Sequence, residues 1–194
     1  MIRRLYLAGP DVFLPNAIEV GRAKVELCRR FGFEGRFPLD NEPAERLTDP
    51  AERGQAIYRS NVELMLACDA ILANLTPFRG PSADAGTVFE VGFFAALAKP
   101  IFAYSSDLRT FAERTSAMLG LASDAAADGE GRVIESFELP DNLMLPGAVR
   151  ASGGEWIVRP GDAGGLAAFE AFEECLRRLQ ASSRFRHRTA AASG

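Results

Sequence analysis

The sequence is poor in residues that bind metals and lacks the glycine motifs that bind nucleotides. It contains one histidine, His187, and three widely spaced cysteines, Cys28, Cys68 and Cys175. A single histidine excludes a His/Cys metal cluster, and an odd number of cysteines within apolar patterns predicts reduced thiols that serve packing. Neither Gly-x-Gly-x-x-Gly nor Gly-Lys-Ser/Thr occurs, which disfavours dinucleotide binding and Walker-type nucleotide binding.

The chain also lacks an excess of basic residues and any long apolar run. Its formal net charge is −4, which offers no broad basic surface to a nucleic-acid backbone, and no segment approaches the roughly 20 apolar residues that span a bilayer. Arg3 and Arg4 precede an apolar run that stops at Gly9-Pro10, too early for a secretory signal. We therefore expect a cytoplasmic protein whose partners are small molecules or copies of itself, with no nucleic acid and no membrane.

Alternating strand and helix patterns fill most of the chain. With 194 residues and 47% apolar content, it is long enough for one well-buried domain, which we place at residues 1–182 with a disordered tail at 183–194. The alternation predicts an α/β fold with an open parallel sheet of about five strands between helices. Strands are expected at 4–8, 35–39, 70–75, 101–104 and 155–158, and helices at 17–31, 50–67, 85–98 and 165–180.

Residues 105–140 break this alternation with stretches rich in Ser, Asp, Ala and Gly. Connections of that length are usually functional or mobile. We expect them to form a lid or a subunit contact.

Two carboxylates, Asp84 and Glu90, lie at the start of the predicted helix from residue 85. A loop rich in Pro, Gly and Ser connects this helix to the strand that ends at Leu75. Ligands of open α/β sheets bind beyond the carboxyl ends of strands, and two carboxyl groups there can divide the cleavage of a glycosidic bond, one as nucleophile and one handling a proton. The competing interpretation is structural: Thr87-x-x-Glu90 fits a capping box, and Asp84 fits a helix cap. Asp69, at the head of a strand, is interpreted as structural.

The turn after the first strand offers two further residues of interest. Asp11 would repel a phosphate placed there, which favours an uncharged ligand. Phe13 is either a core residue or an aromatic face for a flat ring, and the core is the default interpretation.

Four segments carry a family resemblance: Tyr6-Leu-Ala-Gly-Pro10, Cys68-Asp-Ala-Ile-Leu-Ala-Asn74, Asp84-Ala-Gly-Thr-Val-Phe-Glu-Val-Gly92 and Asn142-Leu-Met144. Through them the chain resembles the nucleoside 2-deoxyribosyltransferase family between about residues 4 and 145. The third segment is the most specific. The resemblance implies a flavodoxin-like fold and homo-oligomers in which a neighbouring subunit completes each active site.

The same resemblance implies roles for individual residues. Glu90 inherits the position of the nucleophile, Asp84 that of base recognition and proton handling, and Tyr6 that of a tyrosine touching the nucleophile. Asn142 matches the asparagine that a neighbouring subunit brings to the sugar, with Met144 on the same wall. Asn61 stands where well-known bacterial members have a second base-contacting aspartate, and an amide both donates and accepts hydrogen bonds. The substrate is further expected to contact Gly9, Pro10, Phe13 and Gly86.

The implied reaction is exchange of the nucleobase of a 2′-deoxyribonucleoside for a free base, through a deoxyribosyl ester on Glu90 and without a metal or cofactor, in nucleotide salvage. One alternative is an N-glycosidase in which water replaces the incoming base, with 5′-monophosphates among its candidate substrates. Another is a non-catalytic sensor of nucleoside derivatives. The acid at Asp11 favours the transferase over a phosphate-binding hydrolase. Purine or pyrimidine preference stays open.

Overall fold

Five short strands form one parallel sheet in the part of the chain that the structure describes. The computed structural model describes residues 2–38, 47–160 and 168–191, with side chains as far as residue 182. The strands are β1 (Arg4–Ala8), β2 (Glu34–Arg36), β3 (Ala70–Asn74), β4 (Ile101–Ser105) and β5 (Trp156–Val158). Their order is β2-β1-β3-β4-β5, and every neighbouring pair is parallel. This is the flavodoxin-like order and confirms the expected fold class. The expected end of the second strand, Leu39, lies outside the described residues.

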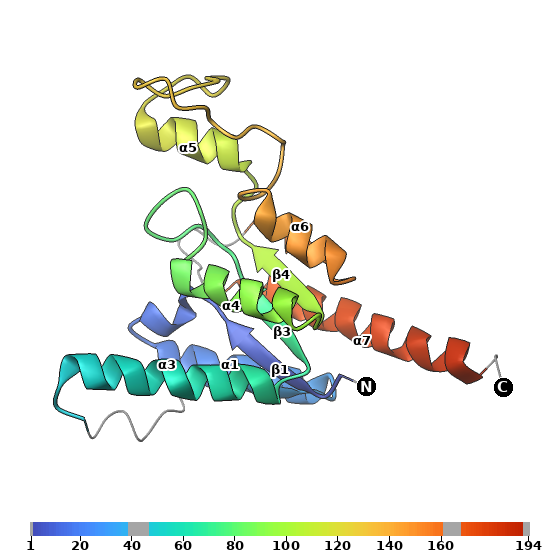
Figure 1. Ribbon diagram of the computed structural model, residues 1–194. Helices are drawn as coiled ribbons and strands as arrows, with labels where there is room; N and C mark the ends of the chain where they lie inside the picture. Colours follow the sequence, from blue (N-terminus) through green and yellow to red (C-terminus); the bar gives the residue numbers. More distant parts are fainter. Residues whose placement is uncertain (1, 39–46, 161–167, 192–194) are drawn as a thin grey trace.

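Helices cover both faces of the sheet (Figure 1). They are α1 (Ala17–Arg30), α3 (Pro50–Ala67), α4 (Ala85–Ala96), α5 (Phe111–Leu119), α6 (Met144–Ala151) and α7 (Phe169–Ala191), with a short 3₁₀ helix η1 (Pro10–Phe13). Side chains alternate along a strand, so Leu5 and Leu7 of β1 pack in the core under α1 and α7. Tyr6 and Ala8 face the opposite core, which α3, α4 and α6 complete. This alternation turns Tyr6 towards α4.

Helix α1 buries most of the hydrophobic face that its sequence pattern predicts. Ile18, Val25, Leu27 and Cys28 recur near helical spacing; Cys28 is buried and Val25 and Leu27 pack against the core, but Ile18 is 59% exposed, whereas Lys24 is 1% exposed. The buried positions of α1 are Ala17, Val20, Gly21, Lys24 and Cys28. The prediction was wrong for Ile18, and it missed Lys24 because a buried ammonium group with partners is tolerated and hydrophobicity alone does not reveal those partners.

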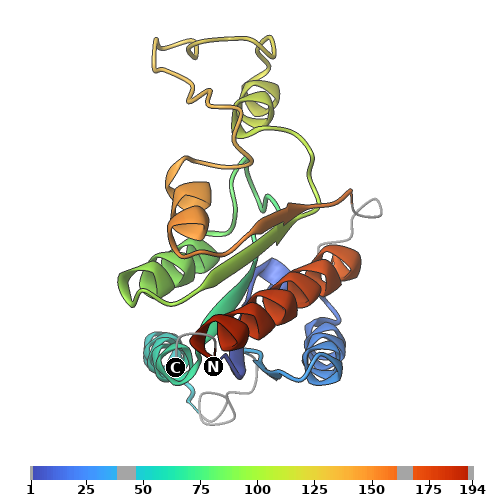
Figure 2. The same ribbon diagram turned by 90° about the vertical axis from the view of Figure 1, so that its right-hand side faces the viewer.

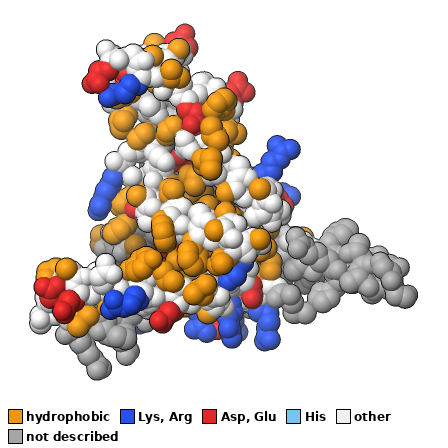
Figure 3. All heavy atoms as spheres, viewed as in Figure 1, with side chains coloured by type: hydrophobic (Ala, Val, Ile, Leu, Met, Phe, Trp, Pro, Cys, Tyr) orange, Lys and Arg blue, Asp and Glu red, His pale blue; other side chains and the backbone are white. Residues whose placement is uncertain are grey.

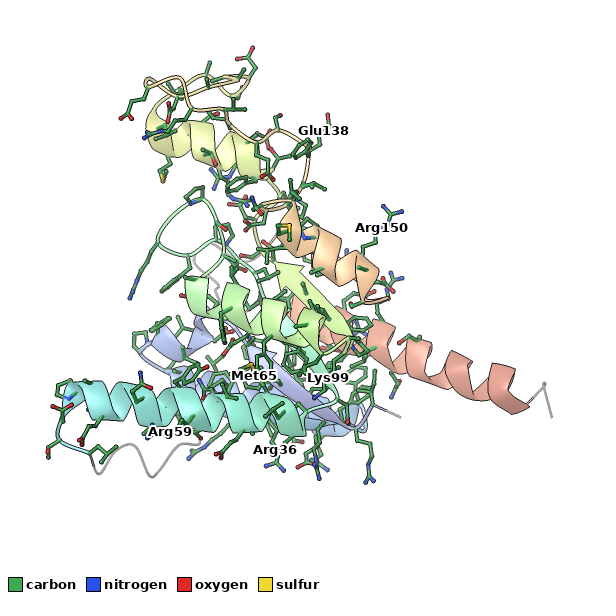
Figure 4. All side chains as sticks on the ribbon, in the orientation of Figure 1. Arg36, Arg59, Met65, Lys99, Glu138 and Arg150 are labelled. Atoms are coloured by element: carbon green, nitrogen blue, oxygen red, sulfur yellow. The ribbon has the colours of Figure 1, made fainter. Side chains whose placement is uncertain are left out.

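Polar contacts fix the ends of α3. The Asp49 side chain caps its first turn by accepting from the Glu52 amide at 2.8 Å. At the other end, Lys99 donates to the carbonyl oxygens of Leu66 at 2.9 Å and Cys68 at 2.6 Å, and Figure 4 shows Lys99 beside Met65 there. A cation suits the carbonyl end of a helix. Since Lys99 follows α4, this contact ties the ends of α3 and α4 together.

Residues 106–143, here called the arm, project away from the sheet (Figure 2). The sequence pattern predicts no helix here, yet the arm contains α5. Thr110 and Glu113 form a capping box at the start of α5, and Gly120 ends it with a left-handed φ of 67°. Helix α6, which directly follows the arm, was also missed.

Helix α7 is longer than expected. It runs to Ala191, so the backbone of residues 183–191, expected as a disordered tail, continues the helix. Arginine and alanine are good helix formers, and a helix already nucleated by packing extends easily through them. The expected start at 165–167 lies outside the described residues. No helix in the described ranges is both long and apolar enough to cross a membrane.

The cysteine prediction is confirmed. Cys28, Cys68 and Cys175 are free and buried, and desolvation raises the pKa of Cys68 to about 11 and that of Cys28 to about 12. They remain protonated thiols in the core. Asp69 is also structural, as predicted, because its carboxylate accepts from the Arg3 and Arg4 amides at 2.8 and 2.9 Å.

Candidate active site

The two carboxylates predicted as a catalytic pair lie on the first turns of α4, beyond the carboxyl end of β3. Asp84 is the helix cap, and its Oδ2 accepts from the Thr87 amide at 3.0 Å and from the Thr87 hydroxyl at 3.2 Å. Thr87 is therefore the third residue of the first turn, so it cannot start a capping box with Glu90. Asp84 is thus a helix cap, as the structural interpretation predicted, whereas Glu90 is not part of a capping box.

The Glu90 carboxylate points to the sheet. Tyr6, fully buried in the middle of β1, donates its hydroxyl proton to Glu90 Oε1 across 2.5 Å. The length is at the short limit for an O–H···O⁻ hydrogen bond, which is the strong kind. A tyrosine one position earlier or later would face the other core, so the strand alternation selects Tyr6 for this contact.

Burial is the main influence on the ionisation of Glu90. Desolvation raises its pKa to about 7; the Tyr6 hydrogen bond works against this rise, and the nearby Asp84 charge adds to it. Desolvation and the Glu90 charge also push the pKa of Tyr6 far above its usual value near 10, so Tyr6 stays protonated as a donor. A carboxyl group with a pKa near neutrality at a ligand-binding edge is a candidate for chemistry.

The turn after β1 approaches the end of β3 closely at Gly9. Gly9 has a φ of 152°, and a Cβ placed there would lie 2.6 Å from Asn74 Cβ and 2.7 Å from Asp11 Oδ2. Only glycine fits such an approach. Pro10 then opens η1. The two predicted substrate-binding residues Gly9 and Pro10 thus shape the rim of the site next to β3.

Phe13, at the end of η1, is not a core residue. It is 53% exposed and stacks on Phe78 with ring centroids 5.2 Å apart and planes 10° apart. The Arg79 guanidinium carbon lies 5.1 Å from the Phe13 centroid, within cation–π range. The default interpretation of Phe13 was wrong, and the ring is an exposed aromatic face on the loop side of the sheet.

Asp11 does not present a free negative charge to a ligand. It is 2% exposed, its Oδ1 accepts from Lys24 Nζ at 2.9 Å, and its Oδ2 accepts from Asn74 Nδ2 at 3.2 Å. Lys24 also donates to the Tyr104 hydroxyl at 2.7 Å. The expectation that Asp11 repels a phosphate was wrong, because a buried lysine neutralises it.

The predicted sugar-side residues lie at the junction of the arm and α6. Asn142 Nδ2 donates to Glu135 at 2.7 Å, and Asn142 Oδ1 accepts from the Met144 amide at 3.1 Å. Met144 is 69% exposed. Among described residues the Glu90 side chain hydrogen-bonds Tyr6 and not Asn142. Within one chain, the structure does not bring Asn142 onto the carboxylate pair.

The remaining predicted substrate contacts are Asn61 on α3 and Gly86 on α4, the helix that also carries Glu90. Asn61 is half-buried on α3. Gly86 is exposed in the first turn of α4, where a Cβ would come within 3.0 Å of Asp84 Oδ2. A side chain at Gly86 would therefore crowd the capping carboxylate.

A cavity of about 420 Å³ lies between the carboxyl ends of β4 and β5 and the base of the arm, lined among others by Arg109, Pro140 and Trp156. None of the predicted site residues lines it. Across the described ranges, no three His, Cys, Asp or Glu side chains gather as metal ligands do.

Sequence reasoning missed two buried ion pairs beside the site. One is Lys24 with Asp11, and the other is Arg114 with Asp141, whose Nη2 and Oδ2 atoms are 3.7 Å apart. Nothing in the hydrophobic pattern of α1 signals the first pair. Nothing in the sequence around Asp141 signals the second.

An open parallel sheet with a half-buried carboxylate beyond its central strands defines an α/β protein with an enzyme-like site. A profile of the nucleoside 2-deoxyribosyltransferase family matches residues 5–144. A 2-deoxyribosyltransferase from Leishmania mexicana is 32% identical in sequence; the match covers 89% of this chain and 97% of that one, with a TM-score of 0.60. A protein of Schizosaccharomyces pombe without a characterised activity is 31% identical over 94% of this chain and 91% of its own length. A conserved protein from Enterococcus faecalis, 20% identical, shares the fold over 92% of this chain and 99% of its own, with a TM-score of 0.57.

The chain therefore belongs to the nucleoside 2-deoxyribosyltransferase family. That family is catalytic and acts on N-glycosidic bonds of nucleosides. The resemblance drawn from the four sequence motifs is confirmed.

Proposed function

We propose that this protein is a nucleoside 2-deoxyribosyltransferase in which Glu90 forms a covalent deoxyribosyl ester. The observation that carries the proposal is the Tyr6–Glu90 hydrogen bond of 2.5 Å. A glutamate that served only in a capping box would accept a hydrogen bond from the backbone amide at the start of its own helix. Glu90 is instead turned inward, desolvated, and held by a group from another element, which is how a nucleophile is oriented.

The reaction runs in two displacements. The Glu90 carboxylate attacks the anomeric carbon, the bond from that carbon to the base nitrogen breaks, and the departing base takes a proton from Asp84. The incoming base then attacks the same carbon, the ester bond breaks to restore the carboxylate, and the proton of the incoming base returns to Asp84. Two inversions leave the sugar with its original configuration.

The hydrogen bonds of Asp84 suit this second role. Both contacts from Thr87 reach Oδ2, and Oδ1 accepts no hydrogen bond from any described residue. Oδ1 is the atom that would exchange a proton with the base. The cap contacts fix the carboxyl group on a rigid helix end, and rigid supports keep a reacting group in place.

Tyr6 and the surrounding residues complete the site. Tyr6 orients Glu90 and stabilises its charge through the same hydrogen bond. Phe13 offers its exposed face to the flat base, and Gly9 and Pro10 keep the rim close to β3. Asn61 and Gly86 lie on the adjoining helices, where Asn61 would donate to or accept from the base.

A second copy of this chain would supply Asn142 and Met144, in a homo-oligomer with shared active sites. Figure 3 shows apolar side chains gathered over α4, between α3 and α6. Exposed apolar residues on or next to these helices and on the arm include Tyr58, Leu66, Phe89, Leu97, Leu108, Val133, Phe137 and Met144. Large exposed apolar patches mark association surfaces. Sedimentation of the purified protein tests this, and a monomer at the concentration of full activity would refute it.

The N-glycosidase is a second candidate function because the argument that Asp11 would repel a phosphate was wrong. Lys24 neutralises Asp11, so this carboxylate does not oppose the binding of a 5′-phosphate at the turn after β1. Both enzymes would share the first displacement, and only the acceptor differs.

One assay separates the candidates. The protein is incubated with deoxyinosine, with and without adenine. Deoxyadenosine formation supports the transferase, hypoxanthine release that does not depend on adenine supports the hydrolase, and binding without turnover supports a sensor. Repeating it with deoxyinosine 5′-monophosphate tests for phosphate acceptance.

The nucleophile is tested with Glu90→Gln, using Glu19→Gln on the exposed face of α1 as the matched control. We expect the first variant to lose both reactions and the control to keep wild-type rates. Intact-mass measurement during turnover should show a deoxyribosyl adduct on the wild type, located at Glu90 by peptide mapping. An adduct on another side chain would overturn the assignment.

A further inference from the structure

Asp141 is a buried carboxylate at the end of the arm that holds two separate parts of the chain. It is 0% exposed and accepts from the Ser82 hydroxyl at 2.6 Å, from the Ala83 amide at 3.0 Å and from the Asn142 amide at 2.8 Å. All three are hydrogen bonds to a charged group, which are stronger than neutral ones.

Arg114 of α5 balances this charge and adds further attachments. The residue is 3% exposed, and its guanidinium lies 3.7 Å from Asp141 Oδ2 and donates to the Pro81 carbonyl at 2.7 Å and to the Pro140 carbonyl at 2.5 Å. It also donates to the Arg109 carbonyl. A buried ion pair gives little net stability compared with apolar packing, but a fully bonded one fixes a unique geometry.

The geometry it fixes joins two predicted site residues. Ser82 and Ala83 immediately precede Asp84, the residue proposed to contact the base. Asn142, proposed to contact the sugar, directly follows Asp141. Segments 58 residues apart in sequence are thus attached to one carboxylate.

We infer that Asp141, supported by Arg114, is a positioning residue that holds Asp84 and Asn142 in their working places. The inference rests on the proposed function for the roles of those two residues. Asp141 itself does not touch the substrate. If Asn142 serves a neighbouring subunit, the same carboxylate connects base recognition in one site with sugar recognition in the next.

The test uses Asp141→Asn, Ser82→Ala and a matched control, all in the full-length protein. Replacing one carboxylate oxygen of Asp141 by an NH₂ group removes an acceptor and the charge that faces Arg114. Ser82→Ala removes only the 2.6 Å hydrogen bond. The control is Asp128→Asn, since Asp128 lies in the same arm and accepts from Glu130 and Arg132 without contacting residues 81–84.

The first readout is amide hydrogen exchange at Ala83, which reports attachment whatever the activity is. We expect about 10-fold faster exchange in Asp141→Asn, because loss of a hydrogen bond to a charged acceptor favours local opening. The control should exchange at the wild-type rate. Equal exchange in all variants would overturn the inference even if the enzyme is active.

The second readout is base exchange per active site, with active sites counted by the amount of trapped deoxyribosyl adduct. We expect kcat/KM for the incoming base to fall about 100-fold in Asp141→Asn, with a raised KM, because small misplacements of positioning groups cost that much. Ser82→Ala should change in the same direction by less. A purely structural role would lower the number of active sites but leave kcat and KM per site unchanged, and that result would refute the inference.

The two readouts also separate this inference from the proposed function. A wild type without exchange or hydrolysis would refute the function, while Ala83 protection would still decide whether Asp141 attaches the loop. If Asp141→Asn fails to fold, Ser82→Ala carries both measurements.

Discussion

Replacing Glu90 by glutamine should abolish activity and at the same time make the protein more stable at alkaline pH. Glu90 is half-buried, and desolvation raises the pKa of its carboxyl group to about 7 from an ordinary value of 4.5. That difference corresponds to about 3 kcal/mol between the protonated and ionised forms in the folded protein. The glutamine side chain of the Glu90→Gln variant would keep the size of the original and still accept from Tyr6, without the buried charge.

The direction of the pH dependence follows from proton binding. Between pH 4.5 and 7 the folded protein holds a proton on Glu90 that the unfolded chain has released. The free energy of unfolding of the wild type therefore falls as pH rises through this window, and Glu90 adds no further change above it. In Glu90→Gln this contribution is absent. The stability difference between variant and wild type should shift in favour of the variant by about 3 kcal/mol from about pH 4.5 to about pH 8.

Urea titrations of both proteins, at one protein concentration and at intervals between about pH 4.5 and about pH 8, measure the difference in the free energy of unfolding. The Glu19→Gln control removes an exposed carboxylate and should follow the wild type. Parallel pH profiles for wild type and Glu90→Gln would refute the reasoning, because they would mean that Glu90 titrates in the folded protein as it does in the unfolded chain. A gain of stability on removal of the reacting group is the usual signature of a strained or desolvated active site.

Three further predictions concern Tyr6, Asp84 and Lys24. Tyr6→Phe removes the donor that opposes the rise in the Glu90 pKa, so the acidic limb of the kcat/KM profile should move to higher pH; an unmoved limb would show that Glu90 does not control it. Asp84→Asn should slow base exchange by about 10²- to 10⁴-fold, the usual contribution of a general acid/base, with little change in thermal stability because Asn caps helices as well as Asp; a large drop in melting temperature would instead indicate a structural role. Lys24→Met leaves the Asp11 carboxylate buried without its partner and should destabilise the fold by about 3–5 kcal/mol in urea unfolding, whereas a loss below about 1 kcal/mol would show that the Lys24–Asp11 ion pair does not hold the fold together.

The sheet was predictable because its signals are local. The central strands β1, β3 and β4 are short apolar runs bounded by turn residues, and the helices between them repeat at three and four residues. The capping signals were less dependable. Thr87-x-x-Glu90 and Thr110-x-x-Glu113 have the same pattern, yet only the second is a capping box in the structure. The difference lies in Asp84, which caps α4 three residues ahead of Thr87.

The buried ion pairs were not predictable, since each joins residues that only the fold brings together. Lys24 lies inside because the Asp11 carboxylate and the Tyr104 hydroxyl accept its hydrogen bonds there. Neither partner is visible from the pattern of α1. This contact also changes the functional argument. A free acid at Asp11 would favour an uncharged substrate, and its neutralisation by Lys24 removes that argument.

The sequence motif around Glu90 does not by itself predict the Tyr6–Glu90 contact. The motif around Glu90 fits a nucleophile and a helix start equally well, since both need a carboxylate near a helix beginning. What separates them is the direction of one side chain on β1. Tyr6 and Ala8 face α4, whereas Leu5 and Leu7 face α7, so a shift of one residue in β1 would replace the tyrosine hydroxyl by a leucine. The donor that turns Glu90 inward therefore depends on strand register, which is a property of the folded sheet and not of the motif.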